Sequence, residues 1–204
     1  MDPNRAGAES VGSRPGGRSE RIRQAVLAAA LSQAMEHGVA NLSIKDIAAR
    51  AGVAETTIYR RWGHRTAVVA DAVTELAGRG NPPPDTGTLR GDLVQLLEQT
   101  RDLVTQPGME RFLGTTIALF ADPDIAAARR TFWNDRLDRI APVIRRGIDR
   151  GELRRGSEPH DVIETLCAPL YFRLFVTDKA IDARFVARCV EHTFAVYADR
   201  TGAG

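Results

Sequence analysis

The sequence predicts an all-α protein, and three features of the chain lead to this expectation. Apolar residues recur at helical spacing through almost everything after Arg18, the alternation typical of strands is absent, and the stretch GRGNPPPDTG at 78–87 interrupts the helical pattern. Proline and glycine at that density end a helix, so they mark a boundary between two helical domains. We expect an arm over residues 1–17, a first domain over 18–77, a linker over 78–87 and a second domain over 88–200.

Composition and charge place the chain among ordinary globular proteins. Its 204 residues are 43% hydrophobic and 26% charged, which suits one large domain or two small ones. The net charge of +2 excludes a uniformly basic nucleic-acid coat. Residues 1–66 carry +4 and the remainder −2, an excess that fits a nucleic-acid footprint on the first domain but also fits chance.

Three features bear on the compartment. The N-terminal arm, MDPNRAGAESVGSRPGGRSE, is rich in Gly, Ser, Pro and Arg and lacks an apolar signal core, so we expect it to be disordered. No apolar run approaches membrane-spanning length. Cys167 and Cys189 lie in apolar helical patterns, which favours two buried, reduced thiols over a disulfide between them. Together these features indicate a cytoplasmic protein.

The first domain is expected to contain four helices. The first begins near Ser19, a suitable N-cap followed by an acid, and stops at Gly38. Two short helices follow within LSIKDIAARAGVAETTIYRRWGHR, residues 42–65. The fourth runs from about Arg65 to Ala77, with a repeating apolar face.

The two short helices have the composition of a helix-turn-helix. Ser43 can cap the first of them, with Asp46 three residues later as in a capping box. Ala48 provides the small side chain that two steeply crossing helices need, Gly52 suits a turn with positive φ, and Ile58 faces inward from the second helix. A generic helical hairpin with the same residues remains the alternative.

The polar and basic side chains around the second short helix suit DNA. Threonine hydroxyls can contact phosphates or base edges, a tyrosine hydroxyl suits phosphate, and arginine suits phosphate or guanine. Arg65 opposes the dipole at a helix start, so an external phosphate is its expected partner, while His64 is a cap or a phosphate contact. Trp62 is expected to anchor the core. The candidate contacts from this reasoning are Thr56, Thr57, Tyr59, Arg60, His64 and Arg65.

The second domain opens with an amphipathic helix over about Leu89 to Val104 and continues with one over Met109 to Phe120. Asp122 and the proline after it should cap a long helix that reaches about Arg150. Within this helix, Pro142 is expected to produce a kink or a division. A loop over 151–159 follows.

The last two helices carry doubled apolar stripes. In one helix, pairs of adjacent apolar residues recur at helical spacing from Val162 to Phe175. In the other, apolar residues recur in the same way from Phe185 to Tyr197. So wide a stripe must bury two faces, which predicts a two-fold dimer interface built from these helices. Burial of both faces within one subunit is the alternative.

The residues AALSQAMEHGVANLSIKDIAARAGVAETTIYRRWGHR, within 26–69, resemble the DNA-binding domain of the TetR family of bacterial transcription regulators. The segment GIDRGELRR at 147–155 resembles a common C-terminal subtype. Three positions depart from the family pattern: Ala34 replaces a large aromatic residue, Ala54 replaces a capping Ser or Thr, and Glu55 stands where Lys or another small or polar residue is common.

The resemblance implies a homodimeric regulator, in the usual case a repressor, that leaves a palindromic operator in double-stranded DNA when a small-molecule effector binds the second domain. The resemblance adds Ser43 to the candidate DNA contacts. It also implies that effector binding moves the fourth helix. Candidate wall residues for the effector are Arg101, Phe112, Thr116, Phe120, Phe132, Trp133, Leu137, Tyr171 and Arg173. Plain core packing of these side chains is the alternative.

Other function classes have little support in the sequence. The four histidines are scattered without metal-type spacing, and neither a glycine-rich phosphate loop nor a nucleophile elbow is present. We therefore expect no enzyme activity, no catalytic residues, no metal and no cofactor. The competing hypothesis is a helical small-molecule-binding protein without regulatory DNA binding.

Overall fold

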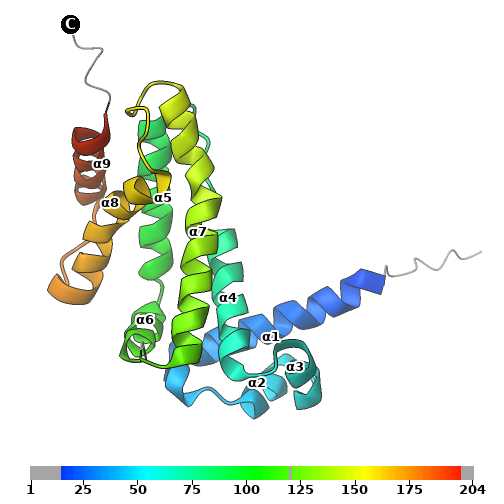
Figure 1. Ribbon diagram of the computed structural model, residues 1–204. Helices are drawn as coiled ribbons and strands as arrows, with labels where there is room; N and C mark the ends of the chain where they lie inside the picture. Colours follow the sequence, from blue (N-terminus) through cyan, green and yellow to red (C-terminus); the bar gives the residue numbers. More distant parts are fainter. Residues whose placement is uncertain (1–14, 120, 199–204) are drawn as a thin grey trace, which may run out of the picture.

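The computed structural model describes residues 15–119 and 121–198, and within them it contains helices and no strand (Figure 1). The all-α prediction is therefore confirmed. The elements are α1 (Pro15–His37), η1 (Val39–Asn41), α2 (Ile44–Ala51), α3 (Glu55–Trp62), α4 (Arg65–Gly80), α5 (Leu89–Val104), α6 (Met109–Ala118), α7 (Pro123–Asp149), α8 (Pro159–Phe172), η2 (Arg173–Thr177) and α9 (Ala183–Tyr197).

Several helix ends differ from the sequence-based expectation. Helix α1 already begins at Pro15, not near Ser19, and Pro suits a first helical position because it has no N–H to satisfy. Most of the expected arm, residues 1–14, lies outside the described residues. Helix α4 runs through Gly80, where Asn81 N–H donates to the Ala77 carbonyl at 3.0 Å, so it enters the predicted linker.

Helix α7 is capped as predicted but is not divided. The Asp122 carboxylate accepts hydrogen bonds from the backbone N–H groups of Asp124 and Ile125. The helix then continues for 27 residues past Pro142. Both Pro142 and Asp138, whose carbonyl loses its donor, are exposed, so water can replace the missing bond.

The last two helices are separated by a wider turn than expected. Helix α8 ends at Phe172, and the predicted continuation to Phe175 is a π-helical turn, η2. The Arg173 side chain donates to the Ala180 carbonyl and lies over the Phe185 ring, with 3.8 Å between guanidinium and ring centre. These contacts hold η2 against the start of α9.

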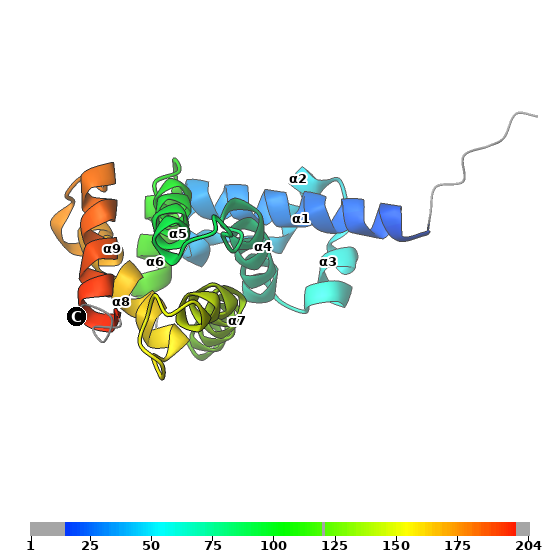
Figure 2. The ribbon, with the colours of Figure 1, turned by 90° about the horizontal axis from the view of Figure 1, so that it is seen from above.

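Two hydrophobic cores support the fold. The first lies among α1–α4 and also takes in Met109 and Phe112 of α6 and Ile125 of α7. The second lies among α5, α7, α8 and α9, and Figures 1 and 2 show α5 and α7 beside α4, with α9 farther from it. The N-terminal helices therefore share a core with the second part of the chain.

Two sets of hydrogen bonds fix the N-terminal helices to the rest. At the end of α1, the Arg111 guanidinium donates to the Glu36 carbonyl at 2.6 Å, and Val39 N–H donates to Thr115 Oγ1 at 3.2 Å. After α4, α7 donates from Arg136 to the Asn81 carbonyl and from Arg146 to the carbonyl of buried Pro84, each at 2.6 Å. The segment between α4 and α5, which we call the docked connection, is therefore held against α7 by hydrogen bonds.

Over residues 15–119 and 121–198, none of the helices combines the length and the apolar character that crossing a bilayer requires.

Candidate DNA interface and ligand cavity

The turn between α2 and α3 has the geometry that the sequence predicts. Gly52 adopts φ 66° and ψ 36°, the left-handed region that glycine enters without strain. Val53 N–H then donates to the Ala48 carbonyl at 3.0 Å. At the start of α2, Ser43 Oγ accepts from Asp46 N–H at 3.3 Å, which confirms the predicted cap.

The inward residues of the motif hold α3 against α1 and α4. Ile58 and Ala48 are buried in the first core. Trp62 packs against the same core, and its Nε1–H donates to Asp71 Oδ2 on α4 at 3.0 Å. Asp71 also accepts from Arg23 of α1 at 3.2 Å, and Arg23 forms two further bonds to Glu75. Trp62 is thus the predicted anchor, and this network orients α3 on α4.

The opposite side of α3 presents the candidate reading residues. Thr56, Tyr59 and Arg60 are exposed, with 51% of Tyr59 accessible, and Thr57 is half-buried. No hydrogen bond or ion pair with the described residues engages these four side chains. The helix therefore offers hydroxyls and a guanidinium to an external partner, as α3 of a helix-turn-helix would to a DNA major groove.

The candidates outside α3 are more constrained. Ser43 is half-buried and already caps α2. His64 Nδ1 lies 2.5 Å from Thr66 Oγ1, and its side chain makes no cap bond to the backbone of α4. The exposed Arg65 guanidinium donates from Nη1 to the Leu42 carbonyl at 3.2 Å, and contact of its other N–H groups with a phosphate stays a prediction. Packing supplies an internal acceptor that the sequence did not indicate.

Glu55 also has a local explanation. Its N-cap neighbour Ala54 makes no side-chain cap bond, as expected from the sequence. Glu55 is exposed in the first turn of α3. A negative charge at that position stabilises the helix through the dipole, which compensates in part for the missing cap.

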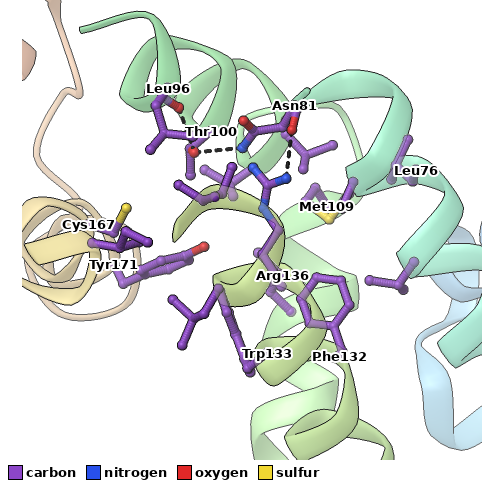
Figure 3. Close-up of a pocket in the computed structure, with 18 of the residues that line it drawn as sticks. Leu76, Asn81, Leu96, Thr100, Met109, Phe132, Trp133, Arg136, Cys167 and Tyr171 are labelled. Carbon is purple, nitrogen blue, oxygen red and sulfur yellow. Dashed lines mark hydrogen bonds between the residues drawn. The ribbon is translucent and has the colours of Figure 1, made fainter. Parts of the chain in front are cut away.

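A cavity of about 400 Å³, which we call the Arg136 cavity, opens between the two cores (Figure 3). Its wall comes from α4, the segment after it, and α5–α8, and is almost entirely apolar. The residues that shape it include Val73, Leu76, Ala77, Asn81, Thr100, Met109, Phe112, Phe132, Trp133, Arg136, Leu137, Cys167 and Tyr171. A second cavity of about 350 Å³ shares Val73, Phe112, Leu113, Phe132, Trp133 and Tyr171 with it.

The structure brings together most predicted wall residues and leaves out the two arginines. Five of them line one or both cavities: Phe112, Phe132, Trp133, Leu137 and Tyr171. Thr116 lines the second cavity. Arg101 lies elsewhere and pairs with Asp102 at 2.8 Å, and Arg173 is bound to Ala180 as described above. Phe120 lies outside the described residues.

Sequence reasoning missed Arg136, Asn81 and Thr100. Asn81 Nδ2 donates to Thr100 Oγ1 at 2.8 Å, and the Asn81 carbonyl accepts from Arg136 (Figure 3). A signal for Arg136 was present, because it interrupts the apolar stripe formed by Trp133, Leu137 and Ile140 on α7. No comparable pattern marked Asn81, which belongs to the proline-rich stretch.

The described residues offer little to a metal ion or to cysteine chemistry. Over residues 15–119 and 121–198, no three His, Cys, Asp or Glu side chains are placed to hold a metal ion. Both cysteines are unbonded thiols. Burial raises the pKa of the Cys167 thiol in the cavity wall to about 12, so it is protonated and unreactive at neutral pH.

Comparison with known protein families matches both parts of the chain. Residues 26–72 match the model described as bacterial regulatory proteins, tetR family. Residues 83–193 match the model described as the tetracyclin repressor-like C-terminal domain.

Individual relatives agree with these matches. The chain is 31% identical to the HTH-type transcriptional regulator AqdR of Rhodococcus erythropolis, over 85% of this chain and 83% of AqdR. It is 30% identical to the uncharacterised HTH-type regulator YdeS of Bacillus subtilis, over 87% and 90% of the two chains. The crystal structure of the TetR-family regulator SCO0332 superposes with a TM-score of 0.74 at 27% identity, covering 86% of this chain and 97% of that one. The chain therefore belongs to the TetR family of bacterial transcription regulators and is a DNA-binding regulator of transcription.

Proposed function

We propose that this protein is a homodimeric repressor that leaves a palindromic operator when an effector fills the cavity. The observation that carries the proposal is the course of α4. Its N-terminal half holds α3 through Asp71 and Trp62, and its C-terminal half lines the Arg136 cavity with Val73, Leu76 and Ala77. One helix thus joins the candidate reading surface to the candidate effector site.

A ligand in this cavity has two routes to the N-terminal helices. It would contact α4 directly, and it would contact α6 through Met109 and Phe112. Helix α6 in turn holds the end of α1 through Arg111 and Thr115. A ligand that prefers one arrangement of α4 and α6 would therefore change the separation of two reading helices in a dimer.

The proposed regulator is tested by its salt dependence. Purified protein should retard a DNA fragment from the region upstream of its own gene. The affinity should fall at least about a hundredfold between 50 and 200 mM salt, because the release of condensed counterions from DNA becomes less favourable as the salt concentration rises. A scrambled fragment of equal length and composition is the control. Absence of salt-dependent retardation on all neighbouring intergenic fragments would contradict the proposal and favour a ligand carrier without regulatory DNA binding.

The dimer is proposed to form through α8 and α9. Large apolar side chains on α8, η2 and α9 would be exposed to water in a monomer. They are Phe172 (57% exposed), Phe175, Val176 and Val196 (52% exposed). An exposed apolar surface of this kind is typical of a subunit interface.

Phe172→Glu combined with Val196→Glu should convert the dimer to a monomer, because four charges would be buried in each two-fold interface. Light scattering at micromolar concentration measures the mass. The control is Ala28→Glu, at an exposed position of α1, a helix that packs mainly against α2, α4 and α6. A wild-type monomer would contradict the proposed dimer, and a double variant that remains dimeric would place the interface elsewhere.

We further propose that the protein has no enzymatic function and acts in the cytoplasm, where its DNA target lies. The protonated Cys167 thiol and the largely apolar wall support the first point, because a protonated thiol is a poor nucleophile and apolar side chains take no part in acid–base chemistry.

A further inference from the structure

The Arg136 cavity contains one cation in an otherwise apolar wall. Among the described residues that line it, Arg136 is the only basic one. Its guanidinium makes a single hydrogen bond within the described residues, from Nη1 to the Asn81 carbonyl at 2.6 Å. Glu164 is the one acidic residue of the wall, but it is exposed and forms no ion pair with Arg136. The remaining N–H groups of the guanidinium are thus available to a ligand.

This placement is unfavourable for an arginine without a ligand. Burial lowers the pKa of Arg136, because it removes water from the charged form. Arg136 is half-buried and pairs with no carboxylate in the described residues, so an anion bound beside it would offset part of this desolvation. Arg101, by contrast, already pairs with the Asp102 carboxylate at 2.8 Å.

The neighbours of Arg136 define the rest of the ligand. Phe132, Trp133 and Tyr171 contribute aromatic rings, with Trp133 and Tyr171 packed edge to face at 5.8 Å. The Tyr171 hydroxyl points toward Arg136 (Figure 3). Burial raises the pKa of this hydroxyl, so it remains a hydrogen-bond donor at neutral pH. Two donors therefore converge in an apolar space of about 400 Å³.

We propose that the effector is an apolar monoanion, in the simplest case a carboxylic acid, whose oxyanion pairs with Arg136 while its apolar body fills the aromatic cavity. The inference rests on the proposed effector-controlled function and specifies the ligand class. Arginine binds planar oxyanions in a forked geometry, and the tyrosine hydroxyl can share the same acceptor.

The same pairing would alter the end of α4. Asn81 is the C-cap of α4, and its carbonyl is the present acceptor for Arg136. An oxyanion competes with this neutral carbonyl, since charge-assisted hydrogen bonds are about twice as strong as neutral ones. Anion binding thus removes a bond between α7 and the end of the helix that carries the reading domain.

A pair of fluorescent probes tests the inference. The anion 8-anilinonaphthalene-1-sulfonate and neutral N-phenyl-1-naphthylamine differ only by the sulfonate, and both fluoresce in apolar sites. Wild-type protein should bind the anion at least about tenfold more tightly, the value of one charge-assisted bond. Arg136→Met should lower the affinity for the anionic probe alone, so that the two affinities become similar. Arg136→Lys should retain part of the preference for the anionic probe.

The control is Arg145→Met, the same change at an exposed position of α7, which should keep the wild-type preference. Unchanged binding of the neutral probe reports an intact cavity in each variant. Equal affinities in wild-type protein, or a preference that survives Arg136→Met, would overturn the inference. Salt-dependent DNA binding measured on the same samples separates the two proposals, because its presence without an anion preference refutes only the ligand class.

Discussion

Replacing Tyr59 by Phe and Arg60 by Ala should weaken operator binding by about a thousandfold, since a charged contact and a neutral one would be lost in each subunit of a dimer. Both side chains are exposed on α3 and neither is engaged by the described residues. The fold should therefore be unaffected, with a melting temperature within about 2 °C of wild type. Affinity is measured by fluorescence anisotropy on the upstream DNA fragment that the wild-type protein retards.

The salt dependence gives this prediction a second readout. Loss of one phosphate contact per subunit should reduce the slope of log affinity against log salt by about 2. The control is Arg61→Ala, which removes the same charge from the same helix. Arg61 lies over the Trp62 ring and donates to Ser19, so it serves packing and should change affinity less than about threefold. Similar losses for Arg60 and Arg61 would show that general charge, not the α3 surface, governs binding.

Asp92→Ala should lower the free energy of unfolding by about 3 kcal/mol and the melting temperature by about 10 °C. Asp92 is fully buried in the first turn of α5. Its Oδ1 accepts from the backbone N–H of Thr86 at 2.6 Å and from the Thr86 hydroxyl at 2.8 Å. Arg146 and Arg150 of α7 lie 3.8 and 3.9 Å from Oδ2. Removal of the carboxylate leaves all of these groups without their common partner.

Two further variants separate charge from packing at this position. Asp92→Asn keeps an acceptor for Thr86 and loses the charge, so it should cost about half as much. Asp102→Ala removes an exposed carboxylate of the same helix that pairs only with Arg101, and should cost less than about 1 kcal/mol. Thermal unfolding followed by circular dichroism measures all three. Equal losses for Asp92 and Asp102 would contradict the role assigned to the buried network.

The docked connection explains why these two predictions concern different properties. Asp92 and Arg146 hold the segment after α4 onto α5 and α7, so they determine how firmly the two cores are joined. Tyr59 and Arg60 lie on the exposed side of α3 and contribute to neither core. Stability and DNA affinity should therefore be separable by mutation.

The local part of the DNA-binding motif could be predicted because its determinants are close in sequence. The cap at Ser43, the left-handed turn at Gly52 and the buried position of Ile58 each depend on backbone geometry within a few residues. Trp62 was likewise expected to anchor the core, and its Nε1–H donates to Asp71 on α4. Such features are specified by periodicity and turn chemistry, which one sequence contains in full.

The polar partners across the molecule could not be predicted in this way. The internal acceptor of Arg65 lies 23 residues away, and Arg136 meets Asn81 across 55 residues. Arg101 and Arg173 looked equally suitable as charged wall residues, yet packing directs both away from the cavity. Helical spacing shows which side chains share a face, but not which face another helix will cover.

The sequence by itself determined the all-α class, the helix-turn-helix and the family, because these depend on local pattern and on a contiguous motif. Only the tertiary structure decided that Arg136 faces the cavity, that α4 extends to Asn81, and that the proline-rich segment is bound to α7. The physical reason is that a side chain's solvation and partners are set by the elements packed around it, and those elements are distant in the chain.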